Sequence, residues 1–168
     1  NGTTGESPTT TDHEQELVVR AVVEAVGDRA LVVAGASSND TVHAIERARL
    51  AAKAGAHGLL VVSPYYNRPP QEGVLKHLTM VADSTELPVM LYDIPGRTGV
   101  AIDVETMVRA AENEKIIAVK DAKGDLWAST HVKAATDLLW FSGEDALNLP
   151  LLALGATGPI LRSTGFPW

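Results

Sequence analysis

The chain has 168 residues, a formal net charge of −7 and no cysteine. Its length is sufficient for one domain with a sizeable hydrophobic core. The acidic balance and the absence of Lys or Arg runs argue against a nucleic-acid partner, and the lack of cysteine excludes disulfides, thiolate catalysis and zinc–thiolate sites. No apolar run is long enough to span a bilayer and no signal peptide opens the chain, so we expect a cytoplasmic protein without a membrane partner.

Amphipathic helices alternate with short apolar runs that are rich in β-branched residues. The first helix is predicted over 12–26, because Thr11 and Glu14 have the spacing of a capping box at its start. Asn39 is expected to cap the second helix. The residues of the first helix that are expected to face inward are Leu17, Ala21, Val22 and Ala25.

The alternation continues to the end of the chain. It has a period of about 20–30 residues, which is typical of right-handed βαβ units in a parallel sheet. The predicted strands cover 30–34, 58–62, 88–92, 116–120, 138–141 and, less completely, 157–161. The later helices are predicted over 41–54, 71–84, 103–111, 126–135 and 146–154.

Two α/β architectures fit this order of elements. One is an open doubly wound sheet and the other is a (β/α)8 barrel. No G-x-G-x-x-G motif follows a strand, so a dinucleotide-binding fold has no support. A complete barrel needs eight strands, and this chain has five full strands and a sixth candidate, so the barrel is expected to be incomplete.

A single lysine ends the predicted strand at 116–120. Lys120 follows four apolar residues, and an amine held against an apolar wall loses solvation, which lowers its pKa and favours attack on a carbonyl carbon. A Schiff base is therefore the chemistry to test, against the simpler interpretation that Lys120 reaches solvent at a strand end. The five histidines lack metal-ligand spacing, and we predict no metal site.

Other polar side chains also follow strands. Tyr92 and Lys120 are one βα unit apart, so we expect them to be neighbours at one edge of the sheet. A phenol in that position can shuttle protons during carbinolamine formation and dehydration. Arg97, in the loop after Tyr92, could hold a substrate carboxylate.

Five motifs give the chain a resemblance to the dihydrodipicolinate synthase (4-hydroxy-tetrahydrodipicolinate synthase) family of the pyruvate-dependent class I aldolase superfamily. They occur in the family's order and spacing over residues 1 to about 158, and their wording is similar to that of actinobacterial members. The motifs are GTTGES (2–7), PYYNRP (64–69), YDIPGRTG (92–99), VKDA (119–122) and SGEDA (142–146).

The resemblance implies an incomplete (β/α)8 TIM barrel over 1–161, from the loop after strand two to about strand eight, followed by an atypical tail over 162–168. It implies condensation of pyruvate with aspartate-4-semialdehyde in lysine and diaminopimelate biosynthesis, through a covalent Schiff base and without a separate cofactor. It also implies at least a homodimer, and usually a homotetramer, for the full-length protein.

The roles of individual residues follow from the resemblance alone. Lys120 matches the Schiff-base lysine and Tyr92 the general acid–base. Thr3 matches the threonine that links this tyrosine to one from a neighbouring subunit, here Tyr66. The matching substrate-binding positions are Thr4 for the pyruvate carboxylate, Arg97 for the aldehyde substrate's carboxylate, and Gly143 and Ile160 for the backbone lining of the pyruvate pocket.

Departures from the family pattern qualify this picture. The histidines and glutamate of the allosteric site in lysine-inhibited members are replaced here by Asp12, Gln15 and His43, so the full-length parent is expected to be insensitive to lysine. One alternative is another pyruvate-dependent aldolase, of the N-acetylneuraminate lyase or 2-keto-3-deoxy-sugar-acid aldolase type. Thr3, Thr4 and Arg97 favour the synthase over it. The other alternative is an inactive truncated fragment.

Overall fold

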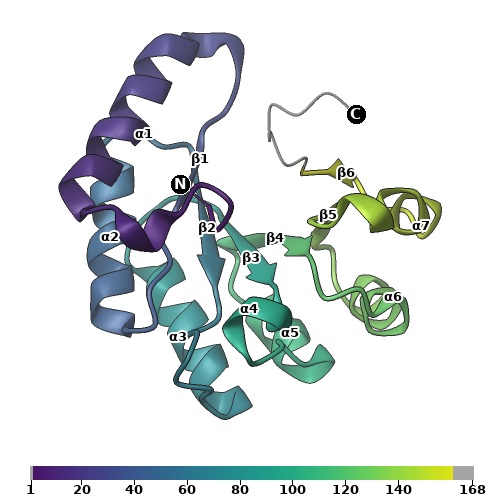
Figure 1. Ribbon diagram of the computed structural model, residues 1–168. Helices are drawn as coiled ribbons and strands as arrows, with labels where there is room; N and C mark the ends of the chain where they lie inside the picture. Colours follow the sequence, from purple (N-terminus) through teal and green to yellow (C-terminus); the bar gives the residue numbers. More distant parts are fainter. Residues whose placement is uncertain (1, 161–168) are drawn as a thin grey trace.

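Six parallel strands form one curved sheet with helices along its outer side (Figure 1). The computed structural model describes residues 2–160. The strands pair in chain order, from β1 to β6. A doubly wound sheet reverses its strand order at a switch point, so the sequential order selects the predicted partial barrel. The strands are β1 Val33–Gly35, β2 Gly58–Val62, β3 Val89–Asp93, β4 Ile116–Asp121, β5 Leu139–Ser142 and β6 Gly158–Pro159.

The predicted helices lie close to their observed positions, but the segment 93–99, for which no helix was predicted, contains the short helix α4, Pro95–Thr98. The predicted helix over 146–154 is divided into a 3-10 turn and a short helix, and Pro150 falls in the first turn of that helix, where it removes no intrahelical hydrogen bond. The predicted tail, 162–168, lies outside the described residues. The α-helices are α1 Asp12–Val26, α2 Thr41–Lys53, α3 Gln71–Asp83, α4 Pro95–Thr98, α5 Val104–Ala110, α6 Leu126–Ala135 and α7 Asn148–Ala153. The 3-10 helices are η1 Ser7–Thr9, η2 Gly27–Arg29 and η3 Asp145–Leu147.

The strands read as continuous apolar runs because both faces of the sheet pack against other groups. Alternate residues such as Val61, Leu91 and Val119 join the main core beneath the helices. The residues between them point to the opposite, concave face, where Val62 and Tyr92 belong to a second, smaller cluster. The same alternation therefore separates the structural side of the sheet from the side that can carry chemistry.

Helix α1 begins as predicted but is rotated relative to the prediction. Thr11 and Glu14 form the capping box. The buried residues of α1 are Gln15 and Val19, whereas Leu17 is 51% exposed, so the predicted inward face was wrong. Gln15 is buried instead, and its side chain is hydrogen-bonded to Ser7 and to Arg47 of α2. Ala21, Val22 and Ala25 are exposed with Leu17.

The cap of α2 also differs from the prediction. Asp40, not Asn39, is the N-cap, and its carboxylate accepts a hydrogen bond from the Val42 backbone N–H at 3.0 Å. Asn39 instead uses its side-chain amide to donate to Asn67 at 3.1 Å. The short polar side chain thus joins two loops rather than ending a helix.

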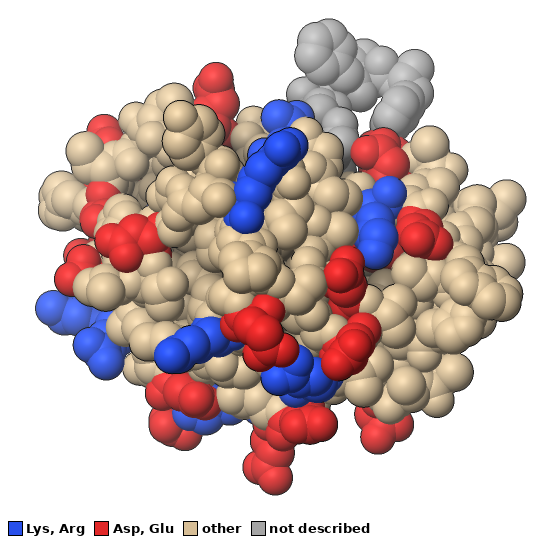
Figure 2. Space-filling view, turned by 90° about the horizontal axis from the view of Figure 1, so that it is seen from below, with Lys and Arg blue, Asp and Glu red and all other residues tan. Residues whose placement is uncertain are grey.

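Charged groups of both signs are interspersed on the face shown in Figure 2, with Lys and Arg side chains lying beside Asp and Glu side chains. That arrangement does not resemble the one-sided basic footprint of a nucleic-acid surface. None of the helices in the described part of the chain is long and apolar enough to cross a membrane.

Candidate active site

Tyr92 and Lys120 lie side by side at the carboxyl ends of β3 and β4. The two residues are direct partners in the strand register. Their side chains therefore project from the same, concave face of the sheet. The Lys120 Nζ atom lies over the Tyr92 ring, 4.1 Å from its centroid. The amine and the phenol are therefore neighbours, as predicted.

Gly143, directly after β5, leaves the space that the Lys120 side chain occupies. A Cβ atom added at Gly143 would lie 2.9 Å from Lys120 Cγ, 3.0 Å from Lys120 Cε and 3.2 Å from the carbonyl oxygen of Asp121. The Gly143 N–H donates to that carbonyl at 2.7 Å, which holds the loop close to β4. Gly143 is therefore tied to the placement of the lysine through space as well as through the backbone.

A cavity of about 230 Å³ lies on the same side of the sheet. Thr3, Tyr92 and Arg97 all line it, although they come from the N-terminal loop, β3 and α4. Tyr92 connects the two parts of the site, because it both contacts Lys120 and lines the cavity. The cavity is mostly apolar at its floor, where Leu60 and Val62 contribute.

The remaining predicted residues lie around this centre. Thr4 is exposed, one residue beyond cavity-lining Thr3. Ile160 donates its backbone N–H to the Ser142 carbonyl at 2.7 Å, which places it beside the end of β5. Tyr65 lines the cavity, whereas Tyr66 is 89% exposed and has a left-handed φ of 70°. The backbone thus directs two adjacent tyrosines to different places.

The carboxylates after Tyr92 and Lys120 point to the helix side of the sheet. Asp121 accepts hydrogen bonds from the Ser129 hydroxyl at 2.6 Å and from the Trp140 indole N–H at 3.1 Å. Asp93 accepts from the Ile102 N–H at 3.1 Å, and burial raises its pKa to about 6. These buried contacts anchor the two strand ends that carry the amine and the phenol.

Sequence reasoning overlooked Arg47, which is only 9% exposed and lines the cavity. A signal was present in the helical pattern. The buried stripe of α2 consists of Ala44, Arg47, Ala48 and Ala51, so a charged residue occupies an apolar position. Burial lowers the pKa of the Arg47 guanidinium, and the negative charge of Asp12 opposes that shift. A buried cation requires hydrogen-bonding or ionic partners, and the neighbouring residues in the sequence do not identify them.

Metal ligation receives no support from the arrangement of acidic and histidine residues. Over residues 2–160, no group of three or more of these side chains is placed to hold an ion. His77 is buried, and burial lowers its pKa to about 4. Its Nδ1 atom lies 3.0 Å from the Thr41 hydroxyl oxygen, within hydrogen-bonding distance.

Comparisons with known proteins agree with this geometry. The family model described as the dihydrodipicolinate synthetase family matches residues 1–164. The 4-hydroxy-tetrahydrodipicolinate synthase of Acidothermus cellulolyticus is 67% identical over 160 residues, which are 95% of this chain and 52% of the relative. The expected likeness to actinobacterial proteins is confirmed. The chain spans about half the length of the curated relatives it matches.

Solved structures give the same result for the fold. A dihydrodipicolinate synthase from Cyanidioschyzon merolae with lysine bound has a TM-score of 0.93 and 45% identity, over 95% of this chain and 55% of that chain. A monomeric dihydrodipicolinate synthase variant has a TM-score of 0.90 and 35% identity, over 96% of this chain and 55% of that one.

Proposed function

The chain belongs to the dihydrodipicolinate synthetase family, and from this premise we propose that it carries the Schiff-base centre of a 4-hydroxy-tetrahydrodipicolinate synthase. The substrates are pyruvate and aspartate-4-semialdehyde, and the pathway is lysine and diaminopimelate biosynthesis in the cytoplasm. The observation that carries this proposal is the contact between the Lys120 amine and the Tyr92 ring, in a space that Gly143 leaves open.

Lys120 is the nucleophile in this proposal. Its amine attacks the keto carbon of pyruvate to give a carbinolamine, and loss of water gives the Schiff base. Tyr92, its neighbour in the strand register, supplies and accepts the protons of these steps. Loss of a methyl proton then gives an enamine, whose carbon attacks the aldehyde carbon of the second substrate. The reaction needs no separate cofactor, because the lysine itself provides the electron sink.

Substrate carboxylates are bound by the groups around this centre. Thr4 and the backbone at Gly143 and Ile160 hold the pyruvate end. Arg97 holds the carboxylate of the aldehyde substrate, since a guanidinium can pair with a carboxylate through two parallel hydrogen bonds. The presence of Thr3 and Arg97 in one cavity with Tyr92 favours the synthase over a sugar-acid aldolase.

Tyr66, supplied by a second copy of the chain, completes the proton relay. It is 89% exposed and does not line the cavity that its own Thr3 lines, so it is available to a neighbouring subunit. We therefore include at least a homodimer, and a homotetramer as the usual assembly, in the proposed function of the full-length protein. A monomer that retains full activity without Tyr66 would contradict this part.

Borohydride trapping tests the central step. The chain is incubated with pyruvate, reduced, digested and analysed by mass spectrometry, and we expect a stable adduct on Lys120. Lys120→Arg keeps the charge and removes the primary amine, so it should abolish the adduct, whereas Lys123→Arg, three residues away, should retain it. A folded protein that gives no adduct, or an adduct on another lysine, would overturn the proposal. Consumption of aspartate-4-semialdehyde together with pyruvate would then identify the synthase, and cleavage of N-acetylneuraminate would identify the lyase.

A further inference from the structure

Two buried polar side chains connect helix α1 to helix α2 and have no part in the proposed chemistry. Gln15 is 7% exposed and Arg47 is 9% exposed, and each occupies the inward stripe of its helix. Burial of an amide and a guanidinium is costly unless their hydrogen-bonding groups find partners. Their partners therefore indicate what the two residues hold in place.

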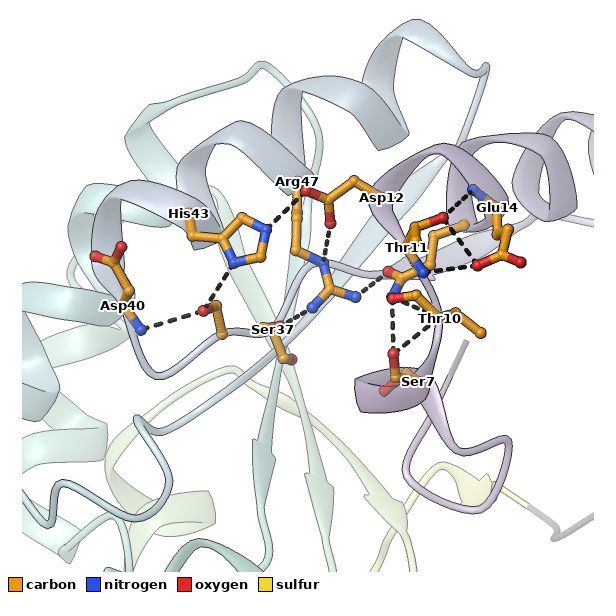
Figure 3. A network of polar contacts seen from close by, with 11 residues as sticks. Ser7, Thr10, Thr11, Asp12, Glu14, Ser37, Asp40, His43 and Arg47 are labelled. Carbon is orange, nitrogen blue, oxygen red and sulfur yellow. Dashed lines mark hydrogen bonds and ion pairs between the residues drawn. The ribbon is translucent and has the colours of Figure 1, made fainter.

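Arg47 connects three segments. One terminal nitrogen donates to the side-chain oxygen of Gln15, and the other donates to the backbone carbonyl of Ser37. Its Nε atom lies 3.8 Å from a carboxylate oxygen of Asp12. Figure 3 shows the guanidinium between Asp12 on α1 and Ser37 on the loop after β1. The cation is thus held at a fixed position between the first helix and the sheet.

The sheet end of this network is Ser37. Its hydroxyl donates to the Leu60 carbonyl at 3.3 Å and accepts from the Val62 N–H at 3.1 Å. Both are residues of β2, and both line the cavity. Through its contact with Ser37, Arg47 therefore connects α1 to the floor of the proposed active site.

The other end of the network is the N-terminal loop. The Gln15 side-chain nitrogen donates to the Ser7 carbonyl at 2.9 Å and to the Thr10 hydroxyl at 2.8 Å. Ser7 in turn donates its N–H to the Gly2 carbonyl at 3.4 Å, which closes the loop that contains Thr3 and Thr4. Residues 2–6 belong to no strand, so this loop has no sheet ladder of its own to place it.

We propose that Arg47 and Gln15 are a positioning pair that holds the Thr3–Thr4 loop against the end of β2 for Schiff-base formation at Lys120. The inference rests on the proposed function, because it assigns the pair a role in that reaction. Neither residue touches the reacting atoms. They act through Ser7 and Ser37, and a displacement of the loop by about 1 Å would change the position of Thr3 in the cavity that Tyr92 also lines.

Gln15→Glu is the sharpest test of the pair. The new carboxylate still accepts from Arg47, so α1 stays docked on α2, but it no longer donates to Ser7 and Thr10. We expect the rate of borohydride-trapped adduct formation at saturating pyruvate to fall by about tenfold to a hundredfold, as for other small misplacements of a catalytic group. Hydrogen exchange of the backbone amides at 5–7 should be faster in the same variant. Arg47→Met should give both effects, and Arg47→Lys should restore part of the rate.

Thr11→Ala is the matched control. It removes the capping box at the same end of α1 and lowers the thermal midpoint, but it leaves the Gln15 and Arg47 contacts intact. We expect its adduct rate to equal that of the unmodified chain. An unchanged adduct rate or unchanged exchange in Gln15→Glu would overturn the positioning role. Failure of the unmodified chain to form any adduct would instead overturn the proposed function.

Discussion

The two walls of the proposed active site are held in place by different kinds of interaction. The central wall consists of β3 and β4, where Tyr92 and Lys120 are register partners in a backbone ladder. The N-terminal wall is the loop of Thr3 and Thr4, which has no strand and is connected to the sheet through η1, α1 and the Gln15–Arg47 pair. One wall depends on main-chain hydrogen bonds, and the other depends on a few side chains.

This difference determines how each wall responds to substitution. A ladder uses backbone groups that every non-proline residue carries, so the central wall tolerates many side-chain changes away from its contact points. A side-chain network loses a partner with each substitution, and a buried group left without a partner is costly. The central wall should therefore fail mainly by steric conflict, and the N-terminal wall mainly by loss of hydrogen bonds.

Gly143→Ala should have the largest effect, because it places a methyl group against Lys120 on the central wall. The added Cβ would lie 2.9 Å from Lys120 Cγ, so the lysine or the loop must move. Overpacking of this kind costs about 1–3 kcal/mol, and we expect the adduct rate to fall by about a hundredfold, since geometry at the nucleophile is most sensitive. Adduct formation followed by mass spectrometry measures this.

Gly158→Ala is the control for that substitution. A Cβ at Gly158, in neighbouring β6, would have no heavy atom within 4 Å, so the adduct rate should be retained. Equal rates in the two alanine variants would show that the Gly143 contact does not set the position of the lysine.

His77, on α3, should make the protein less stable in acid. Burial lowers its pKa from 6.5 to about 4, so between these pH values the unfolded chain binds a proton that the folded protein excludes. Its contribution is fully present above pH 6.5 and is lost as the pH falls towards 4, by about 3 kcal/mol in all. Urea unfolding of His77→Gln should show a flatter pH dependence over this window. Parallel profiles for the two proteins would contradict the assignment.

Asp93, at the end of β3, should have the opposite pH dependence. Burial raises its pKa from 3.8 to about 6, so in this window the folded protein holds a proton that the unfolded chain has lost. Stability from this group is fully present below pH 3.8 and is lost as the pH rises through 6, by up to about 3 kcal/mol. Asp93→Asn keeps an oxygen for the Ile102 N–H and should be more stable than the unmodified chain at pH 8 but not at pH 4. Urea unfolding at both values tests this.

The free amino acid lysine, added as an inhibitor, should have the smallest effect of all, because we expect no inhibition. Behind the N-terminal wall, Asp12 and Gln15 of α1 already contact residues of α2: His43 Nε2 lies 2.8 Å from Asp12, and Gln15 is hydrogen-bonded to Arg47. We expect the full-length parent to show no inhibition by lysine in a steady-state assay with both substrates. Inhibition at sub-millimolar lysine would contradict this expectation.

Much of the central wall could be predicted from the sequence. The apolar runs that end in Tyr92 and Lys120 mark two strands one βα unit apart, and parallel strands in sequence order place such residues side by side. The motif at Ser142 likewise places Gly143 at the end of β5. Local pattern is sufficient here because a strand's periodicity and its ladder depend on neighbouring residues and on the adjacent strand.

The N-terminal wall could not be predicted in the same way. The capping box correctly located the start of α1, but the expected inward face of Leu17 and Val22 was wrong. Gln15 is buried there instead, and the periodicity of α1 contains no information on its hydrogen bond to another helix. Gln15 and Arg47 are 32 residues apart, and neither has a partner within its own helix that would reveal the pair.

By itself, the sequence determined the order of strands and helices and the position of Tyr92 and Lys120 at one edge of a parallel sheet, and its motifs implied the partial barrel through a family resemblance. Only the tertiary structure decided which side of α1 is buried, which tyrosine lines the cavity and which arginine is held beside it. The physical reason is that periodicity is a local property of the chain, whereas a buried polar group requires a partner whose position is set only when distant segments pack together.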